Sequence, residues 1–405
     1  MANGMQPIDE VTRGLRALGP CRSSRLIRHL VQELRIKEDA ARKRLSRSKG
    51  VERLPHILLP HREKFLFLPD QHGSSEFWGA LLSDLVETNS AYGVAMESVM
   101  ARGSVGLFED FETISGSPAR TTSKSQRFSA AEIRHALIQI GWLEEVQVGS
   151  SRMLAHGDVG TKQIRRLSAV RSAEAILLKG LKSWVRKMGF ASWGKVRTRE
   201  DEEKPMIDPF QWDLSGPSYI YPLRGGSAKK TRPGFIGIDI TLGQELPDSG
   251  ARYFDQKSKL YRKQKNSLPL MSILVAQGFS ESALKFGRGN GLVLATPEVL
   301  FGEEVGKGLK EFIQLMTDSV LSSFEPQKVE QLFNRHGSIE GAALNLRGAL
   351  FELLVGYCVR EREGGGTEIG RILDVEGKNS RSTCSGEKGK RPSLCMNAKG
   401  SHRRE

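Results

Sequence analysis

Residues 268–302, LPLMSILVAQGFSESALKFGRGNGLVLATPEVLFG, decide the fold of the central part of this chain. Two apolar runs within it, SILVA and GLVLAT, are continuous rather than alternating, which is typical of strands covered on both faces. The segment between them has the pattern of a helix, and a second helix begins after the second run. The order strand, helix, strand, helix predicts an α/β layered structure.

The residues upstream extend the same architecture. Residues 233–243, PGFIGIDITLG, form a buried-strand pattern around a single acid, Asp239. An amphipathic helix is predicted over residues 168–189, and the charged segment KVRTREDEEKP that follows is expected to be a loop. Helix, strand, strand, helix and strand together predict an α/β sandwich with a mixed sheet, which we place at residues 165–325.

The N-terminal residues have a different, helix-rich pattern. Between residues 8 and 69 three amphipathic helices are expected, and VERLPHILLPHREKFLFLP then offers two short apolar runs around a Pro-His-Arg turn. The third helix, in KEDAARKRLSRSKG, carries acids in its first turn and bases in its last, as the helix dipole prefers. This pattern predicts a winged helix-turn-helix domain over residues 1–70, whose third helix enters the major groove of DNA.

The third helix supplies the candidate DNA-binding residues. Its outward basic side chains could read guanine edges or hold phosphates, and the alternative is an ordinary solvated helix face. These residues are Arg42, Lys43, Arg44, Arg47 and Lys49. Residues 71–160 read as further helices, either a helical packing domain or a second winged-helix unit. Winged helices also serve as protein–protein adaptors, so the fold alone does not decide the function.

Composition supports a polyanionic partner. The 405 residues contain 61 Lys plus Arg against 47 Asp plus Glu, a formal charge of +14, which favours double-stranded DNA over a membrane surface. The four cysteines show neither a disulfide framework nor paired zinc-ligand spacing, and no apolar run reaches spanning length. A cytoplasmic location is therefore expected.

The stretch SILVAQGFSESALKF…GNGLVLATPEVLFG resembles the C-terminal half of Mrr-like restriction-endonuclease domains, in the PD-(D/E)xK nuclease superfamily. In that family a helix glutamate, a strand aspartate and a (D/E)-x-K on the next strand hold Mg²⁺ and activate water. The resemblance implies Glu174 and Asp239 as metal ligands. The third member is missing, because Asp255-Gln256-Lys257 has the D-x-K letters in a polar, helical or looped context. We therefore predict a nuclease-like fold without activity.

A second domain of the same kind is expected to begin at residues 326–377. Glu352, beside an apolar helical stripe, matches the helix acid of the resemblance and is the candidate catalytic residue and Mg²⁺ ligand. Glu376-Gly377-Lys378 spells E-x-K, but a central glycine makes a poor catalytic strand. Residues 378–405 are basic and lack apolar periodicity, which predicts a disordered tail.

The genetic code suggests why that second domain stops. A shifted reading frame permits EIDVL followed by VYECKG, the order expected of a metal-binding strand pair, so we predict a frameshift near residues 377–380. The chain as written is then catalytically dead, whereas an intact relative is a Mg²⁺-dependent DNA endonuclease. Two alternatives remain: a non-catalytic winged-helix transcriptional regulator, in which the nuclease-like fold forms a homodimer, and a protein–protein adaptor.

Overall fold

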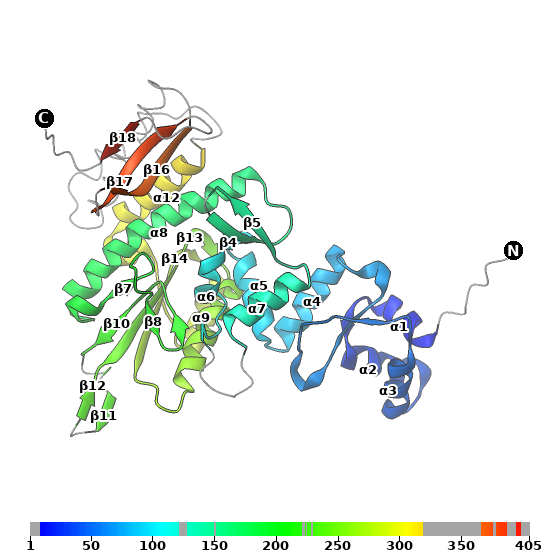
Figure 1. The fold of residues 1–405 in the computed structure, drawn as a ribbon. Helices are drawn as coiled ribbons and strands as arrows, with labels where there is room; N and C mark the ends of the chain where they lie inside the picture. Colours follow the sequence, from blue (N-terminus) through cyan, green and yellow to red (C-terminus); the bar gives the residue numbers. More distant parts are fainter. Residues whose placement is uncertain are drawn as a thin grey trace, which may run out of the picture.

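The computed structural model describes residues 9–120, 128–149, 151–220, 223, 225–227, 230–318, 366–375, 378–386 and 394–397 (Figure 1). Within this part of the chain, helix-rich units at the N-terminal side precede a larger α/β domain, and the elements run in several separate sheets. The protein is therefore an α/β multidomain chain, as the sequence indicates.

The N-terminal unit contains three helices and a three-stranded antiparallel sheet of order β1-β3-β2. Its elements are α1 (Glu10–Leu18), β1 (Cys21–Arg22), α2 (Ser23–Leu34), α3 (Glu38–Arg47), β2 (Glu52–Arg53) and β3 (Phe65–Phe67). Asp9 caps α1 by accepting from the Thr12 amide at 2.6 Å, and a left-handed Arg35 (φ 50°) ends α2. The three helices and the hairpin predicted here are present.

The next unit repeats that element order from its second helix onward. Both units run helix, strand, helix, helix, strand, strand, and the sheet of this one has the matching order β4-β6-β5. Its elements are α4 (Ser75–Glu87), α5 (Ala91–Met100), β4 (Val105–Leu107), α6 (Phe111–Ile114), α7 (Ala130–Gln139), β5 (Glu144–Val148) and β6 (Ser151–Ala155). Ser129 and Glu132 form a capping box that begins α7. Of the two predictions for residues 71–160, this topology favours a second copy of the first unit's architecture.

The β2–β3 hairpin of the first unit is buried against the second unit. Phe65 and Phe67 share a hydrophobic cluster with Phe77 and Leu81 of α4, and Phe77 meets both rings edge-on, at centroid distances of 5.5 and 5.1 Å. The hairpin therefore joins the two units through its apolar side chains, so its apolar faces are not available to a partner.

The α/β domain is built on a five-stranded mixed sheet of order β15-β14-β13-β10-β7. Strands β13, β14 and β15 are parallel, and β10 runs antiparallel to both β13 and β7. Its main elements are α8 (Thr161–Lys187), β7 (Arg197–Thr198), β10 (Leu214–Ser218), β13 (Gly234–Leu246), α9 (Asp248–Arg262), β14 (Leu270–Phe279), α10 (Glu281–Asn290), β15 (Val293–Ala295), α11 (Pro297–Phe301) and α12 (Glu303–Asp318). Short hairpins add β8 (Met206–Ile207), β9 (Phe210–Gln211), β11 (Gly225–Ser227) and β12 (Lys230–Arg232).

Helices cover both faces of this sheet, which explains its continuous apolar runs. Ile238 and Ile240 of β13 pack against α8 and α12, whereas Trp212 and Leu274 lie in the cluster formed with α9 on the other face. The two layers are visible in Figure 1, with α8 and α12 together on one side of the sheet and α9 on the other. The predicted mixed sheet between helical layers is confirmed.

A third three-stranded sheet lies near the C-terminus. It is antiparallel, with β17 between its neighbours, and it contains β16 (Gly366–Val375), β17 (Lys378–Gly386) and β18 (Leu394–Asn397). Strands thus lie at 378–386 and 394–397, within the residues for which a disordered tail was predicted. Apolar periodicity does not indicate these strands, because backbone pairing within the sheet tolerates polar residues. Glu352 lies outside the described residues.

Candidate functional site

Two acids from different elements lie close together at one end of the sheet. Glu174 is on the inner face of α8, and Asp213 directly precedes β10. Both carboxylates accept a backbone amide of β13: Glu174 Oε1 accepts from Leu242 N at 3.0 Å, and Asp213 Oδ2 accepts from Ile240 N at 2.7 Å. These two bonds attach α8 and the start of β10 to the same strand.

Arg199 joins these two acids. Its Nη2 donates to Glu174 Oε2 at 2.5 Å and its Nη1 donates to Asp213 Oδ1 at 2.8 Å. The side chains are 7%, 9% and 3% exposed for Arg199, Glu174 and Asp213, so water can screen this group only slightly. A guanidinium thus lies between two buried carboxylates, at the place where a cation bound by both would have to lie.

The electrostatics of this group favour its charged form. Burial alone would raise the pKa of Asp213, but Arg199 and the Ile240 amide hold that pKa below the usual 3.8. Burial would lower the pKa of Arg199, yet the surrounding carboxylates raise it well above its usual value. The group is therefore an ionised cluster, which we call the Arg199 cluster (Glu174, Arg199 and Asp213).

A second buried ion pair lies on the other face of the sheet. Lys257 Nζ of α9 donates to Asp239 Oδ2 of β13 at 2.6 Å, and the two side chains are 1% and 0% exposed. The same ammonium donates to the Thr113 carbonyl at 3.2 Å and lies 4.1 Å from the centre of the Trp212 ring. Burial raises the pKa of Asp239 to about 6 and lowers that of Lys257, so both groups are shifted towards neutrality.

One backbone amide connects the two charged groups. The Asp213 amide donates to Asp239 Oδ1 at 3.2 Å, while the Asp213 carboxylate belongs to the Arg199 cluster. Glu174 and Asp239, the two acids named from the sequence, are therefore both buried, but they act on opposite faces of the sheet. Neighbouring residues of a strand point to opposite faces, so Asp239 lies away from Glu174 while Ile240 faces α8.

Sequence reasoning missed two participants, Asp213 and Arg199, and placed a third, Lys257, in a polar context although it is buried. Asp213 had the same signal as Asp239, a single acid in an apolar context. Lys257 recurs at helical spacing with Tyr253 and Tyr261 on the inner face of α9, so a lysine within an aromatic stripe was a usable signal. Arg199 had none, because it lies in a segment of alternating charges.

The letters of the expected metal motif do not come together. Asp255-Gln256-Lys257 lies within α9, where Lys257 turns inward and Asp255 instead pairs with Lys259 at 2.8 Å. Two positions after Asp239 stands Thr241, whose Oγ1 accepts from Arg102 Nη2 at 2.8 Å. Among the described residues, no group of three or more His, Cys, Asp or Glu side chains is placed to hold a metal ion.

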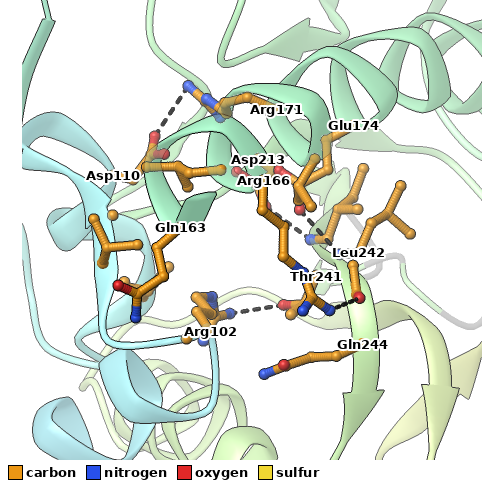
Figure 2. A pocket seen from close by; sticks show the side chains of 18 of the residues that line it. Arg102, Asp110, Gln163, Arg166, Arg171, Glu174, Asp213, Thr241, Leu242 and Gln244 are labelled. Atoms are coloured by element: carbon orange, nitrogen blue, oxygen red, sulfur yellow. Dashed lines mark hydrogen bonds and ion pairs between the residues drawn. The ribbon is translucent and has the colours of Figure 1, made fainter. Parts of the chain in front are cut away.

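A cavity of about 210 Å³ opens beside the Arg199 cluster. Figure 2 shows Arg166 and Gln163 entering it from α8, with Arg102 and Gln244 across from them. Gly243, with φ +97°, brings β13 close to α8: a Cβ at this position would lie 2.6 Å from Val170 Cγ2. The cavity wall contains four arginines and three acids, namely Arg102, Arg166, Arg171, Arg199, Asp110, Glu174 and Asp213.

The basic residues predicted on the third helix are all exposed, because Ala41 and Leu45 turn the opposite face of α3 into the core. The helix is shorter than predicted: it ends at Arg47, with an extended Ser48 after it, so Lys49 lies beyond α3. Arg42 pairs with Glu38 at 2.6 Å, one turn earlier, and Arg44 pairs with Glu10 of α1. Lys43, Arg47 and Lys49 make no ion pair with the described residues. We call these five side chains the α3 basic face.

Comparisons with known proteins do not assign this chain to a family. No family model matches the chain, and no curated protein or solved structure is significantly similar to it. None of the helices in the described part of the chain is long and apolar enough to cross a membrane.

Proposed function

We propose that this chain is a double-stranded DNA-binding protein whose α/β domain has a restriction-endonuclease-like fold but does not cleave DNA. The α3 basic face carries the DNA-binding part of the proposal. It presents four exposed cations on the helix and a fifth, Lys49, just beyond its C-terminal end, and three of the five have no carboxylate partner among the described residues.

The arrangement around α3 is compatible with a winged helix-turn-helix. The N-terminal unit has helix, strand, helix, helix and two strands in that order, with α3 as the helix that would enter the major groove. The apolar side of the hairpin is buried against the second unit, so the proposal assigns the DNA contact to the exposed basic residues, first of all those of α3.

The salt dependence of binding tests this proposal. Five cations that each displace a counterion give a slope of about −4 to −5 for log affinity against log salt concentration. We would measure the anisotropy of a fluorescent duplex at several salt concentrations. A flat dependence, or no binding, would reject DNA binding and favour the adaptor alternative.

Charge reversal locates the contact. Arg42→Glu, Arg44→Glu and Arg47→Glu together should abolish duplex binding. A matched control reverses Arg262, Lys263 and Lys265, which are exposed at the end of α9, so the net charge changes equally. Retained binding in the first variant, or equal loss in both, would contradict the assignment of α3.

The first variant also breaks two ion pairs, so a milder change is needed alongside it. Lys43→Gln, Arg47→Gln and Lys49→Gln remove only cations without carboxylate partners, and the unfolding temperature should therefore stay unchanged. This variant should reduce the magnitude of the salt slope by about 3 if each cation meets one phosphate.

The Arg199 cluster supports the absence of cleavage. If the chain follows the nuclease pattern, Glu174 is the helix acid, Asp213 the strand acid and Asp239 the acid of the next strand, with Thr241 in place of the lysine. Arg199 would then neutralise two of the acids that Mg²⁺ needs. Incubation of the full chain with plasmid DNA and Mg²⁺ should leave the DNA intact. Cleavage that disappears in Glu174→Gln would refute this part of the proposal.

The catalytic role of Glu352 stays a prediction, since Glu352 lies outside the described residues. The frameshift also stays a prediction. Sequencing of the coding DNA across codons 375–405 and beyond tests the frameshift directly. A single base that restores EIDVL and VYECKG would support the prediction of an active relative, whereas confirmation of the present frame would remove it.

A further inference from the structure

The cavity beside the Arg199 cluster has walls from two units. One wall is the face of α8 that carries Gln163 and Arg166, and a second is the end of β13 around Gly243. The third is the segment from Arg102 to Ile114, which belongs to the unit before α8. At about 210 Å³ the cavity greatly exceeds the roughly 10–15 Å³ that one water needs by the same measure, so a small organic molecule can enter.

Two arginines in the cavity have no carboxylate partner among the described residues. Arg102 donates to Ser98 Oγ at 2.7 Å and to Thr241 Oγ1 at 2.8 Å, and Arg166 donates to the Gly243 carbonyl at 2.5 Å. All these acceptors are neutral, so both positive charges remain uncompensated. Figure 2 shows the two side chains directed towards the same space.

A third arginine has an unused donor. Arg171 pairs with Asp110 at 3.1 Å, but its Nη1 is buried and has no hydrogen-bond partner. A buried donor without an acceptor is costly, so an acceptor supplied by a ligand would be favourable there. Glu174 and Asp213 do not compete for such a ligand's contacts, because both are already paired with Arg199.

The apolar part of the cavity wall indicates what the rest of the ligand would be. Apolar side chains line the same cavity, and they would contact a non-polar body rather than a second charge. They are Val105, Ile114, Leu167, Val170, Ile240 and Leu242. The four arginines exceed the three acids of the wall by one positive charge, which favours an anionic ligand.

We propose that this cavity binds a small organic anion, with a carboxylate or phosphate head held by Arg102 and Arg166 and a compact apolar body. Because its walls come from both units, such a ligand would stabilise their packing. This inference goes beyond DNA binding and does not depend on it.

Three probes separate the head group from the body: inorganic phosphate, phenyl phosphate and benzoate. We would follow the unfolding temperature and the binding heat of the full chain with each. Phenyl phosphate, benzoate or both should bind saturably and raise the unfolding temperature, since a ligand of the folded state stabilises it. No binding of either organic probe, or equal affinity for inorganic phosphate and phenyl phosphate, would overturn the proposal.

Substitutions place the binding in this cavity. Arg166→Gln should weaken the bound probe at least tenfold and, because Arg166 is exposed, should leave the fold intact. Arg102→Lys provides a second test on the opposite wall. Lys162→Gln, on an exposed residue of α8 outside the cavity, is the matched control. Unchanged affinity in Arg166→Gln would show that the probe binds elsewhere and would overturn the proposal.

DNA phosphates could supply the same head group, so the source must be distinguished. The measurement is repeated in the Arg42→Glu, Arg44→Glu, Arg47→Glu variant, whose α3 basic face is reversed. Phenyl phosphate or benzoate should bind this variant as it binds the original chain, with no displacement by a short duplex. Displacement by the duplex would assign the cavity to a DNA backbone and would overturn the small-ligand proposal.

Discussion

Removal of Arg199 is the sharpest test of the charged cluster at the sheet end. In Arg199→Met each carboxylate keeps its backbone donor, Leu242 N for Glu174 and Ile240 N for Asp213, and loses its guanidinium. Removal of one partner from a buried ion pair typically costs about 3–5 kcal/mol, because a charge is left buried and uncompensated. With roughly 2–4 °C per kcal/mol for a domain of this size, the unfolding temperature should fall by about 6–20 °C.

The control is an arginine two residues away. Arg197 pairs with Glu203 at 3.0 Å, but these side chains are 37% and 76% exposed. A pair of that kind contributes about 1 kcal/mol or less, so Arg197→Met should change the unfolding temperature little. Differential scanning calorimetry of both variants gives the comparison directly.

Neutralising the acids should restore much of the loss. In Arg199→Met with Glu174→Gln and Asp213→Asn, the amide oxygens still accept from the two β13 amides, and none of the three residues of the Arg199 cluster remains charged. The damage of Arg199→Met alone should also be smaller near pH 4 than near pH 8, because the freed acids can then take up protons. A loss below about 1 kcal/mol, or no recovery in the triple variant, would refute the view that the cluster is held by charge.

Mg²⁺ adds an independent readout to the same variant. If Arg199 occupies a place that a cation can take, Mg²⁺ should raise the unfolding temperature of Arg199→Met and leave that of the original chain unchanged. Equal effects on both would show that the acids are not poised for a metal ion.

Two further predictions concern the sheet. Burial raises the pKa of Asp239 from 3.8 to about 6, so between these pH values the folded state binds more protons than the unfolded state. The free energy of unfolding should therefore fall as pH rises from about 4 to about 6, and Asp239 contributes about 3 kcal/mol to this fall at most. Asp239→Asn should remove this fall in urea unfolding at several pH values, and an unchanged slope would contradict the raised pKa. Gly237→Ala places a Cβ 2.7 Å from the Trp212 ring and should cost about 1–3 kcal/mol. Gly79→Ala, at an exposed position of α4 with open space for the Cβ, should instead raise the free energy of unfolding by about 0.5–1 kcal/mol. If both substitutions changed the free energy of unfolding in the same direction, the steric explanation would be refuted.

Local patterns predicted the elements well where burial was complete. The run SILVA became β14 and PGFIGIDITLG became β13, because strands covered on both faces need continuous apolar residues, whereas GLVLAT became the edge strand β15, where Val293 is 44% exposed. The α3 basic face followed in the same way from helical periodicity, since its apolar residues Ala41 and Leu45 must face inward.

Contacts between residues that are far apart in the sequence could not be predicted from such local patterns. The tail strands were missed because β17 pairs with β16 and β18 pairs with β17 through the backbone, and such pairing leaves little trace in a polar sequence. The burial of Phe65 and Phe67 against α4 could not be foreseen either, since an apolar hairpin looks the same whether it packs on its own helices or on a neighbour.

The sequence by itself determined the mixed α/β sheet, the exposed basic helix and the burial of Asp239, because each depends on the polarity of residues close along the chain. Only the tertiary structure decided which charges meet. Arg199 lies 25 residues from Glu174 and 14 from Asp213, and Lys257 lies 18 from Asp239. Coulombic attraction acts across space, so a buried acid becomes a metal ligand or half of an ion pair according to the cation that folding brings beside it.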